Sequence, residues 1–281
     1  MTTTEDLRKQ QFDYWNGEMG KAWAEAQDFF DGMLHPFEEL LVEEVQHLSP
    51  RSVLDVGCGN GTTTLAIKRN LPSRARCVGI DISEPMLTNA RDRAAIAGLD
   101  TAFLLADAAV HRFKKKEYDV IASRFGVMFF ADPGAAFANL RSATKTRGYL
   151  RFVVWRSPED NEFMTAAARA AAPLLPNFEP RDPSAPGPFS MANADQTRSC
   201  LMGAGWGRPE LIAHDVTCRF PRSKLELFFA SVERLGINPD DLDPSLLNEL
   251  SDAIRDAYAP YIKGDEVEFV GRCWMIRAPA Q

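Results

Sequence analysis

The chain has 281 residues, of which 45% are hydrophobic, so it is long and apolar enough to form a packed globular core. Its 32 basic and 39 acidic side chains give a net charge of -7, with no dense basic block beyond Lys114 to Lys116. This balance argues against nucleic acid or an anionic membrane as a partner.

The apolar stretches are too short, and too often broken by charges, to cross a membrane. The N-terminus is polar and lacks a hydrophobic signal region, so we expect a cytoplasmic protein. The five cysteines and four histidines are dispersed, without a close pair or a cluster of metal ligands. We therefore expect reduced cysteines and no bound metal.

The first forty-odd residues have a helical composition and carry aromatic side chains along their length. Because they precede the first expected strand, we expect them to contribute to a cap over a ligand site. Tyr14 and Trp15 are the expected lid residues. The alternative is that an amphipathic helix buries these aromatic rings against the sheet.

From Ser52 to Trp155, short apolar runs alternate with helical stretches, which is typical of βαβ units that build a parallel sheet. The expected strands are residues 52–56, 76–80, 102–106, 118–123 and 149–155. The expected helices are residues 62–70, 84–97 and 133–145.

Beyond Trp155, an alanine-rich helix (162–172) leads into a proline-rich insertion. The later expected elements are helices at 195–204, 224–235 and 245–258 and strands at 210–220 and 267–277. We expect one α/β domain, doubly wound and Rossmann-like, with a mostly parallel seven-stranded sheet whose last strand is antiparallel. Its core would comprise residues 45–155 and 190–281, and its cap residues 1–44, 156–189 and 222–264.

The first strand runs into the sequence V-L-D-V-G-C-G-N-G, which ends at Gly61. Its alternate glycines permit a tight turn and the close approach of a ligand, at the edge where strand-end crevices form. A dinucleotide fingerprint would need a glycine where Thr62 stands, and the Gly-Lys-Ser/Thr ending of a phosphate loop is absent. The loop therefore indicates a ligand site of another kind.

Asp81 ends the second expected strand, where an acid can accept hydrogen bonds from both hydroxyls of a ribose. A nicotinamide-dependent oxidoreductase would share Asp81, but the glycine spacing argues against it. A non-catalytic nucleoside-binding protein would have no reason to retain Asp55, Asp81 and the glycines together.

Four segments together resemble class I S-adenosylmethionine-dependent methyltransferases, in the bacterial branch related to ubiquinone and menaquinone biosynthesis enzymes. They are D-x-G-x-G-x-G from Asp55, G-I-D-I-S around Asp81, L-L-A-D-A ending at Ala108, and S-R-F-G-V-M-F-F-A-D-P from Ser123. The resemblance is strong from Ser52 to Trp155 and only general beyond.

The resemblance implies S-adenosylmethionine as cofactor and methyl transfer to a small or medium organic acceptor, at oxygen, nitrogen or carbon, by a monomer or homodimer. It places the Asp107 carboxylate near the adenine amino group. The cofactor-binding residues that it implies are Asp55, Gly57, Cys58, Gly59, Gly61, Asp81, Ile82, Met86, Asp107, Ala108 and Ser123.

Methyl transfer from a sulfonium needs mainly alignment and the exclusion of water, although a hydroxyl acceptor also needs a base. His111 is the candidate base nearest in sequence to a cofactor-lining segment, with a surface role as the alternative. Arg124, Phe125 and Met128 are expected on the acceptor side. A salt bridge for Arg124 and core packing for Met128 are the alternatives.

Overall fold

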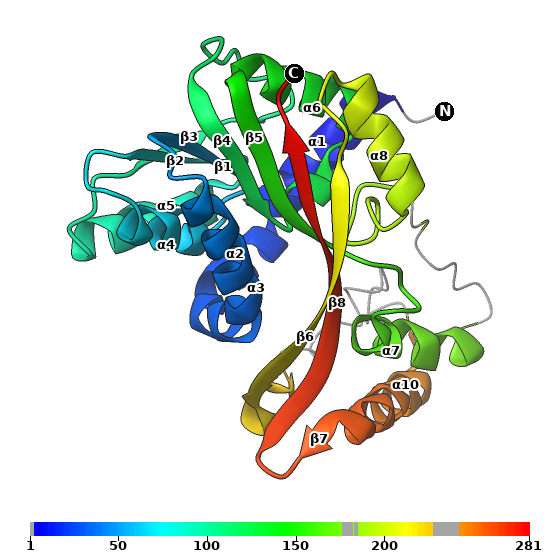
Figure 1. The fold of residues 1–281 in the computed structure, drawn as a ribbon. Coiled ribbons are helices and arrows are strands. Elements are labelled where there is room, and N and C mark those ends of the chain that lie inside the picture. The colour runs from blue at the N-terminus through cyan, green and yellow to red at the C-terminus, as the bar shows by residue number, and fades with distance from the viewer. Residues whose placement is uncertain (1–2, 176–181, 183–184, 227–241) are drawn as a thin grey trace.

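A mixed sheet of eight strands forms the centre of this computed structural model, which describes residues 3–175, 182, 185–226 and 242–281. The strand order is β3-β2-β1-β4-β5-β8-β6, and the short β7 pairs with β8 (Figure 1). The strands are β1 (Ser52–Val56), β2 (Arg76–Asp81), β3 (Ala102–Leu105), β4 (Tyr118–Arg124), β5 (Thr144–Trp155), β6 (Glu210–Pro221), β7 (Ile262–Lys263) and β8 (Glu266–Pro279).

Strands β1 to β5 are parallel, whereas β8 runs antiparallel to both β5 and β6. The predicted fold class is confirmed, with the two-residue β7 as an addition. Helices cover both faces: α3, α4 and α5 lie on one side, and α6 and α8 on the other (Figure 1). The helices are α1 (Thr4–Asn16), α2 (Glu18–Glu25), α3 (Gln27–His47), α4 (Thr62–Asn70), α5 (Glu84–Ile96), α6 (Pro133–Ala143), α7 (Glu162–Ala171), α8 (Ala194–Gly203) and α10 (Pro244–Tyr258).

Most element boundaries fall within two residues of those predicted from the sequence, but β5 begins at Thr144 rather than at residue 149. The backbone turns extended at Thr144, which ends α6, and Thr144 then pairs with Tyr118 of β4. The Asp132 side chain caps α6 by accepting a hydrogen bond from the Ala135 N–H. Most of the helix predicted at 224–235 lies outside the described residues.

The N-terminal helices differ in their burial, because α3 belongs to the hydrophobic core whereas α1 does not. Phe37, Leu41 and Val45 of α3 have no exposed surface and belong to the core that joins the sheet to its helices. Helix α1, in contrast, has no buried residue. The part of the predicted cap that falls in α3 therefore packs against the sheet through its apolar stripe. Helix α2 also contacts this core, because Trp23 stacks on Phe30 of α3, with ring centroids 3.8 Å apart.

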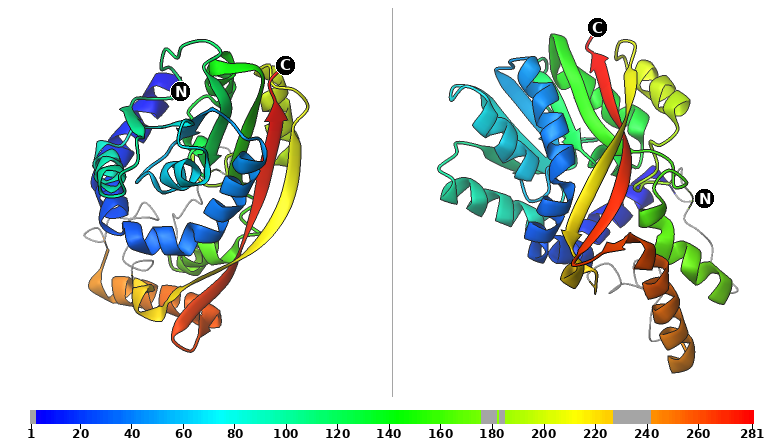
Figure 2. Two further views of the ribbon diagram at one scale, coloured as in Figure 1. Left: turned by 60° about the vertical axis from the view of Figure 1, so that its left-hand side comes forward. Right: turned by 60° about the horizontal axis from the view of Figure 1, so that its bottom comes forward.

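Strands β6 and β8 pair well past the end of β5, and their projecting part lies beside α7 and α10 (Figure 2). Phe163 of α7 stacks on Phe269 of β8, with ring centroids 4.0 Å apart. This contact fixes α7 against the projecting strands. Among the residues that the structure describes, no helix is both long and apolar enough to cross a membrane.

Candidate active site

A cavity of about 710 Å³ lies at the carboxyl ends of β1, β2, β3 and β4. Strand β1 has β2 on one side and β4 on the other, so the strand order reverses there. Ligands of open α/β sheets bind at such a switch point. The strand-end loops that line this strand-end cavity comprise residues 56–60, 80–82, 106–109 and 124–126.

The turn after β1 depends on glycine at two positions that line the cavity. Gly57 and Gly59 have φ values of 66° and 51°, in the left-handed region that glycine adopts without strain. A Cβ at Gly57 would lie only 2.6 Å from the Cα of Gly126, in the loop after β4. The turn thus brings bare backbone to the cavity and packs tightly against the loop behind it.

Two of the carboxylates that line the cavity come from the strand ends, one at the end of β2 and one after β3. Asp81 accepts hydrogen bonds from the N–H groups of Gly59 (2.8 Å) and Ser83 (2.9 Å), although burial raises its pKa. Asp107 accepts from the Ala109 N–H and from Nε of Arg8, both at 2.8 Å. Each carboxylate oxygen can accept a second hydrogen bond, so both groups can still receive donors from a ligand.

Asp55 lies behind the glycine turn and does not line the cavity. Only 1% of its surface is exposed, and one of its oxygens accepts a hydrogen bond from Thr64 Oγ1 at 2.6 Å. Its other oxygen, Oδ1, has no hydrogen-bond partner. Burial raises the pKa of this carboxyl to about 7. The hydrogen-bond partner of Asp55 therefore belongs to the start of α4.

An aromatic compartment forms the part of the cavity beyond the glycine turn. Phe125 stacks on Trp155, with centroids 4.1 Å apart and planes within 9°. The stacked pair Phe163 and Phe269 lines the same cavity, as does Tyr258 of α10. Four of these five rings were not predicted from the sequence, because they come from segments that only the tertiary fold brings together.

Helix α1 closes over the cavity and is held by the strand-end loops themselves. The Ser83 hydroxyl donates to the Trp15 carbonyl (2.7 Å), and the Asn16 amide donates to the Ile82 carbonyl (2.8 Å). The Trp15 ring packs edge-on against Phe129, at 5.0 Å between centroids. Trp15 and Tyr14 both line the cavity.

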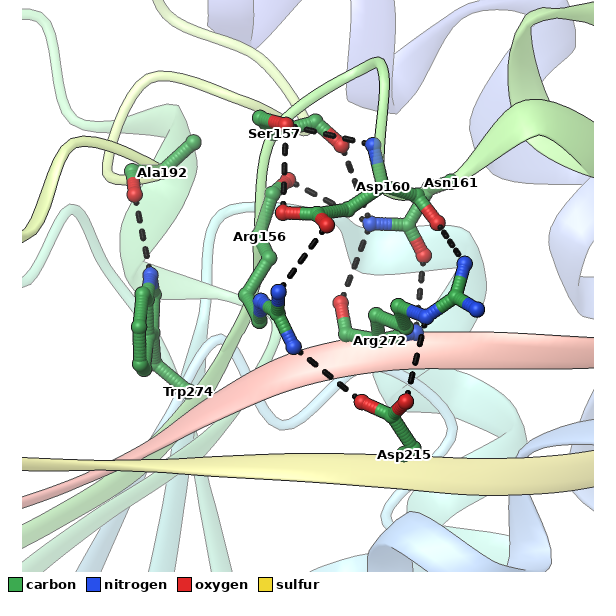
Figure 3. A network of polar contacts seen from close by, with 8 residues as sticks. All are labelled: Arg156, Ser157, Asp160, Asn161, Ala192, Asp215, Arg272 and Trp274. Atoms are coloured by element: carbon green, nitrogen blue, oxygen red, sulfur yellow. Dashed lines mark hydrogen bonds and ion pairs between the residues drawn. The ribbon is translucent and has the colours of Figure 1, made fainter.

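A polar network fixes the crossover from β5 to α7 (Figure 3). Asp215 of β6 accepts from Arg156 and from Arg272 of β8, both at 3.1 Å. The Asn161 side chain exchanges two hydrogen bonds with the Arg272 backbone, at 3.0 and 2.9 Å. The network joins the loop between Trp155 and α7 to both projecting strands. It thereby positions the two cavity-lining segments on either side of that loop.

Most of the predicted site residues line the cavity. They are Tyr14, Trp15, Gly57, Cys58, Gly59, Asp81, Ile82, Met86, Asp107, Ala108, Arg124, Phe125 and Met128. Asp55 does not line the cavity, and neither do Gly61, Ser123 and His111. Gly61 caps α4 and faces Ala90 of α5, and the Ser123 hydroxyl donates to the Val56 carbonyl. The His111 ring packs edge-on against Phe113, so its position gives no support to the expected role as a base.

Residues 53–148 match a family model described as a methyltransferase domain. A demethylmenaquinone methyltransferase of Thermus thermophilus is 33% identical over 115 residues, which cover 41% of this chain and 52% of that protein. The chain spans about half the length of the curated relatives that it matches.

Solved structures show the same fold. The YcgJ protein from Bacillus subtilis has a TM-score of 0.59 at 20% identity, covering 88% of this chain and 99% of its own. The phosphoethanolamine N-methyltransferase 2 of Haemonchus contortus, in complex with S-adenosyl-L-methionine, has a TM-score of 0.57 at 14% identity, covering 98% and 60%. These similarities support neither the oxidoreductase nor the non-catalytic alternative.

Proposed function

We propose, on the premise that residues 53–148 are a class I methyltransferase domain, that the chain transfers a methyl group from S-adenosylmethionine to a small or medium organic acceptor. The observation that carries this proposal is the cavity in which a glycine turn, two carboxylates and an aromatic compartment meet under a helical cover.

The residues at the strand ends fit the nucleoside part of this cofactor. Asp81 is locked by backbone donors at the end of β2, where its free lone pairs can accept from ribose hydroxyls. Asp107 lies one strand further along the sheet, suited to an adenine amino group. Ile82 and Met86 add apolar surface for the ring. The bare backbone at Gly57 and Gly59 leaves room for the sulfur-bearing part.

When bound, the cofactor would supply a methyl group bonded to a positively charged sulfur, and this sulfur can leave as a neutral thioether without further activation. The tasks left to the protein are therefore to align the acceptor and to exclude water, which together can contribute about 7 to 11 kcal/mol. The Trp15–Phe129 contact closes the cavity from above. The stacked rings of Phe125 and Trp155 offer a flat apolar surface that would hold the acceptor in line.

The aromatic compartment favours an acceptor with a substantial apolar body. Its walls come from β5, α7, β8 and α10, and Met128, only 1% exposed, adds a soft side chain beside them. Ligand pockets of this kind fix orientation with a few polar groups and gain affinity from apolar burial. We therefore place a small or medium organic molecule, rather than a macromolecule, at this site.

Calorimetry and mass spectrometry test the proposal directly. We expect one site per chain for S-adenosylmethionine and for S-adenosylhomocysteine, and no comparable binding of NAD. Incubation with S-adenosylmethionine and a metabolite extract should add the mass of one methyl group to a single class of molecules. Tight NAD binding, or the absence of any methylated product together with absent cofactor binding, would overturn the proposal.

Asp81→Asn should weaken S-adenosylhomocysteine binding by about tenfold or more, because a neutral amide replaces charge-assisted hydrogen bonds to the ribose. The N–H groups of Gly59 and Ser83 donate to different oxygens of Asp81, so asparagine keeps only one of these two hydrogen bonds, and the melting temperature should fall by about a few degrees while the protein stays folded. Titration calorimetry measures the affinity, with Asp92→Asn on the exposed face of α5 as the matched control. Unchanged affinity in Asp81→Asn would remove Asp81 from the ribose site.

A further inference from the structure

Arg124, at the end of β4, is the one cationic side chain of the strand-end cavity that has no ion-pair partner among the described residues. Three cations line this cavity. Arg8 pairs with Asp107, and Lys9 pairs with Asp13. No carboxylate oxygen in the described part of the chain lies within 4.0 Å of the Arg124 guanidinium. The carboxylates of Asp31, Glu38 and Asp55 act on this guanidinium only from beyond 4.0 Å, so an anionic group of a ligand can still pair with it directly.

The contacts of Arg124 orient its guanidinium but leave some of its N–H donors unused. Its Nε donates to Thr63 Oγ1 at 2.9 Å, and its Nη1 donates to the Leu34 carbonyl at 3.4 Å. A guanidinium has five N–H donors, so most remain for a ligand. Thr63 belongs to the first turn of α4, whose N-cap, Gly61, has no side chain to satisfy the helix N–H groups. The surroundings therefore add positive potential to the cation.

The sheet order places Arg124 at one end of a continuous row of polar groups. Asp107 follows β3, Asp81 ends β2, the glycine turn follows β1 and Arg124 ends β4, in the spatial order β3-β2-β1-β4. Three strand spacings of about 4.8 Å separate the two ends of this row, or about 14 Å. A ligand whose nucleoside lies at Asp107 and Asp81 therefore presents its far end to Arg124.

We infer that Arg124 binds the carboxylate on the amino-acid portion of S-adenosylmethionine, through guanidinium donors that its protein contacts leave open. The inference rests on the proposed function and moves Arg124 from the acceptor side, where the sequence placed it, to the cofactor. The same end of the cofactor carries an ammonium group. Asp31 also lines the cavity, where its carboxylate pairs with Arg93 at 2.8 Å and still adds negative charge near this end.

The binding of two different nucleosides distinguishes the contact at Arg124 from the other contacts of the site. Arg124→Met should weaken S-adenosylhomocysteine binding by at least tenfold in titration calorimetry. Binding of 5′-methylthioadenosine, which has the same nucleoside but no amino-acid portion, should change less than about twofold. Arg91→Met, on the exposed face of α5 where Arg91 pairs with Glu84, is the matched control and should change neither affinity.

An unchanged affinity of Arg124→Met for S-adenosylhomocysteine, or an equal loss for both nucleosides, would overturn the inference. The wild-type protein gives a test that does not depend on the variant's folding. Decarboxylated S-adenosylhomocysteine, which keeps the ammonium, should bind at least tenfold more weakly than the intact molecule, and equal binding would again overturn the inference. Wild-type protein that bound none of these nucleosides would instead overturn the proposed function itself, and the inference with it.

Discussion

Asp55→Asn is expected to stabilise the protein at pH 8 far more than at pH 5. Burial raises the pKa of Asp55 to about 7, against 3.8 for the exposed group. A carboxyl whose pKa is raised on folding contributes its stability below pH 4, and that contribution is lost as the pH rises to about 7. At about 1.4 kcal/mol per pH unit, the cost of ionising Asp55 grows by about 3 kcal/mol between pH 5 and pH 8.

Asparagine at position 55 keeps an acceptor for Thr64 Oγ1 and has no proton to lose, so it avoids this cost. Urea denaturation of both proteins at pH 5 and pH 8 measures the difference, with the exposed-site variant Asp92→Asn as the control. A free-energy difference between Asp55→Asn and wild type that is the same at both pH values would contradict the prediction.

The glycine turn and Asp81 were predictable because their signals are local, whereas the place of Asp107 came from the family resemblance. A strand, a turn and a helix start occupy consecutive residues, and parallel strands bring their carboxyl ends to one edge of the sheet. The positions of Gly57 and Gly59 at that edge follow from these two facts. Nothing in this reasoning needs contacts between distant segments.

The aromatic compartment was not predictable in the same way. Phe163 and Tyr258 have ordinary helical settings, and only the packing of α7 and α10 beside the projecting β6–β8 strands turns them into the cavity. For His111, nearness in sequence to Asp107 does not bring the residue to the cavity wall. The turn in which the His111 N–H donates to the Asp107 carbonyl directs the His111 ring to Phe113 instead.

Deleting residues 1–16, which removes α1, should lower turnover at least a hundredfold while leaving the core folded. No residue of α1 is buried, so the deletion takes little apolar surface from the core. It does remove the Trp15 ring from the cavity and breaks the hydrogen bonds of Ser83 and Ile82 to the cover. Without that cover, water enters and the acceptor is no longer held in line, and small misalignments can cost two orders of magnitude in rate.

The matched comparison is Phe37→Ala in α3, the helix that belongs to the core. Phe37 has no exposed surface, so this variant should lose about 3 to 5 kcal/mol of stability and melt much earlier than the α1 deletion. Thermal melts and steady-state kinetics on both proteins distinguish a role in folding from a role in turnover. Tyr14→Ala and Trp15→Ala serve as point variants of α1. A deletion that failed to fold would make α1 part of the core despite its exposure. Unaltered kinetics would leave the exclusion of water to α7 and α10, whose side chains also line the cavity.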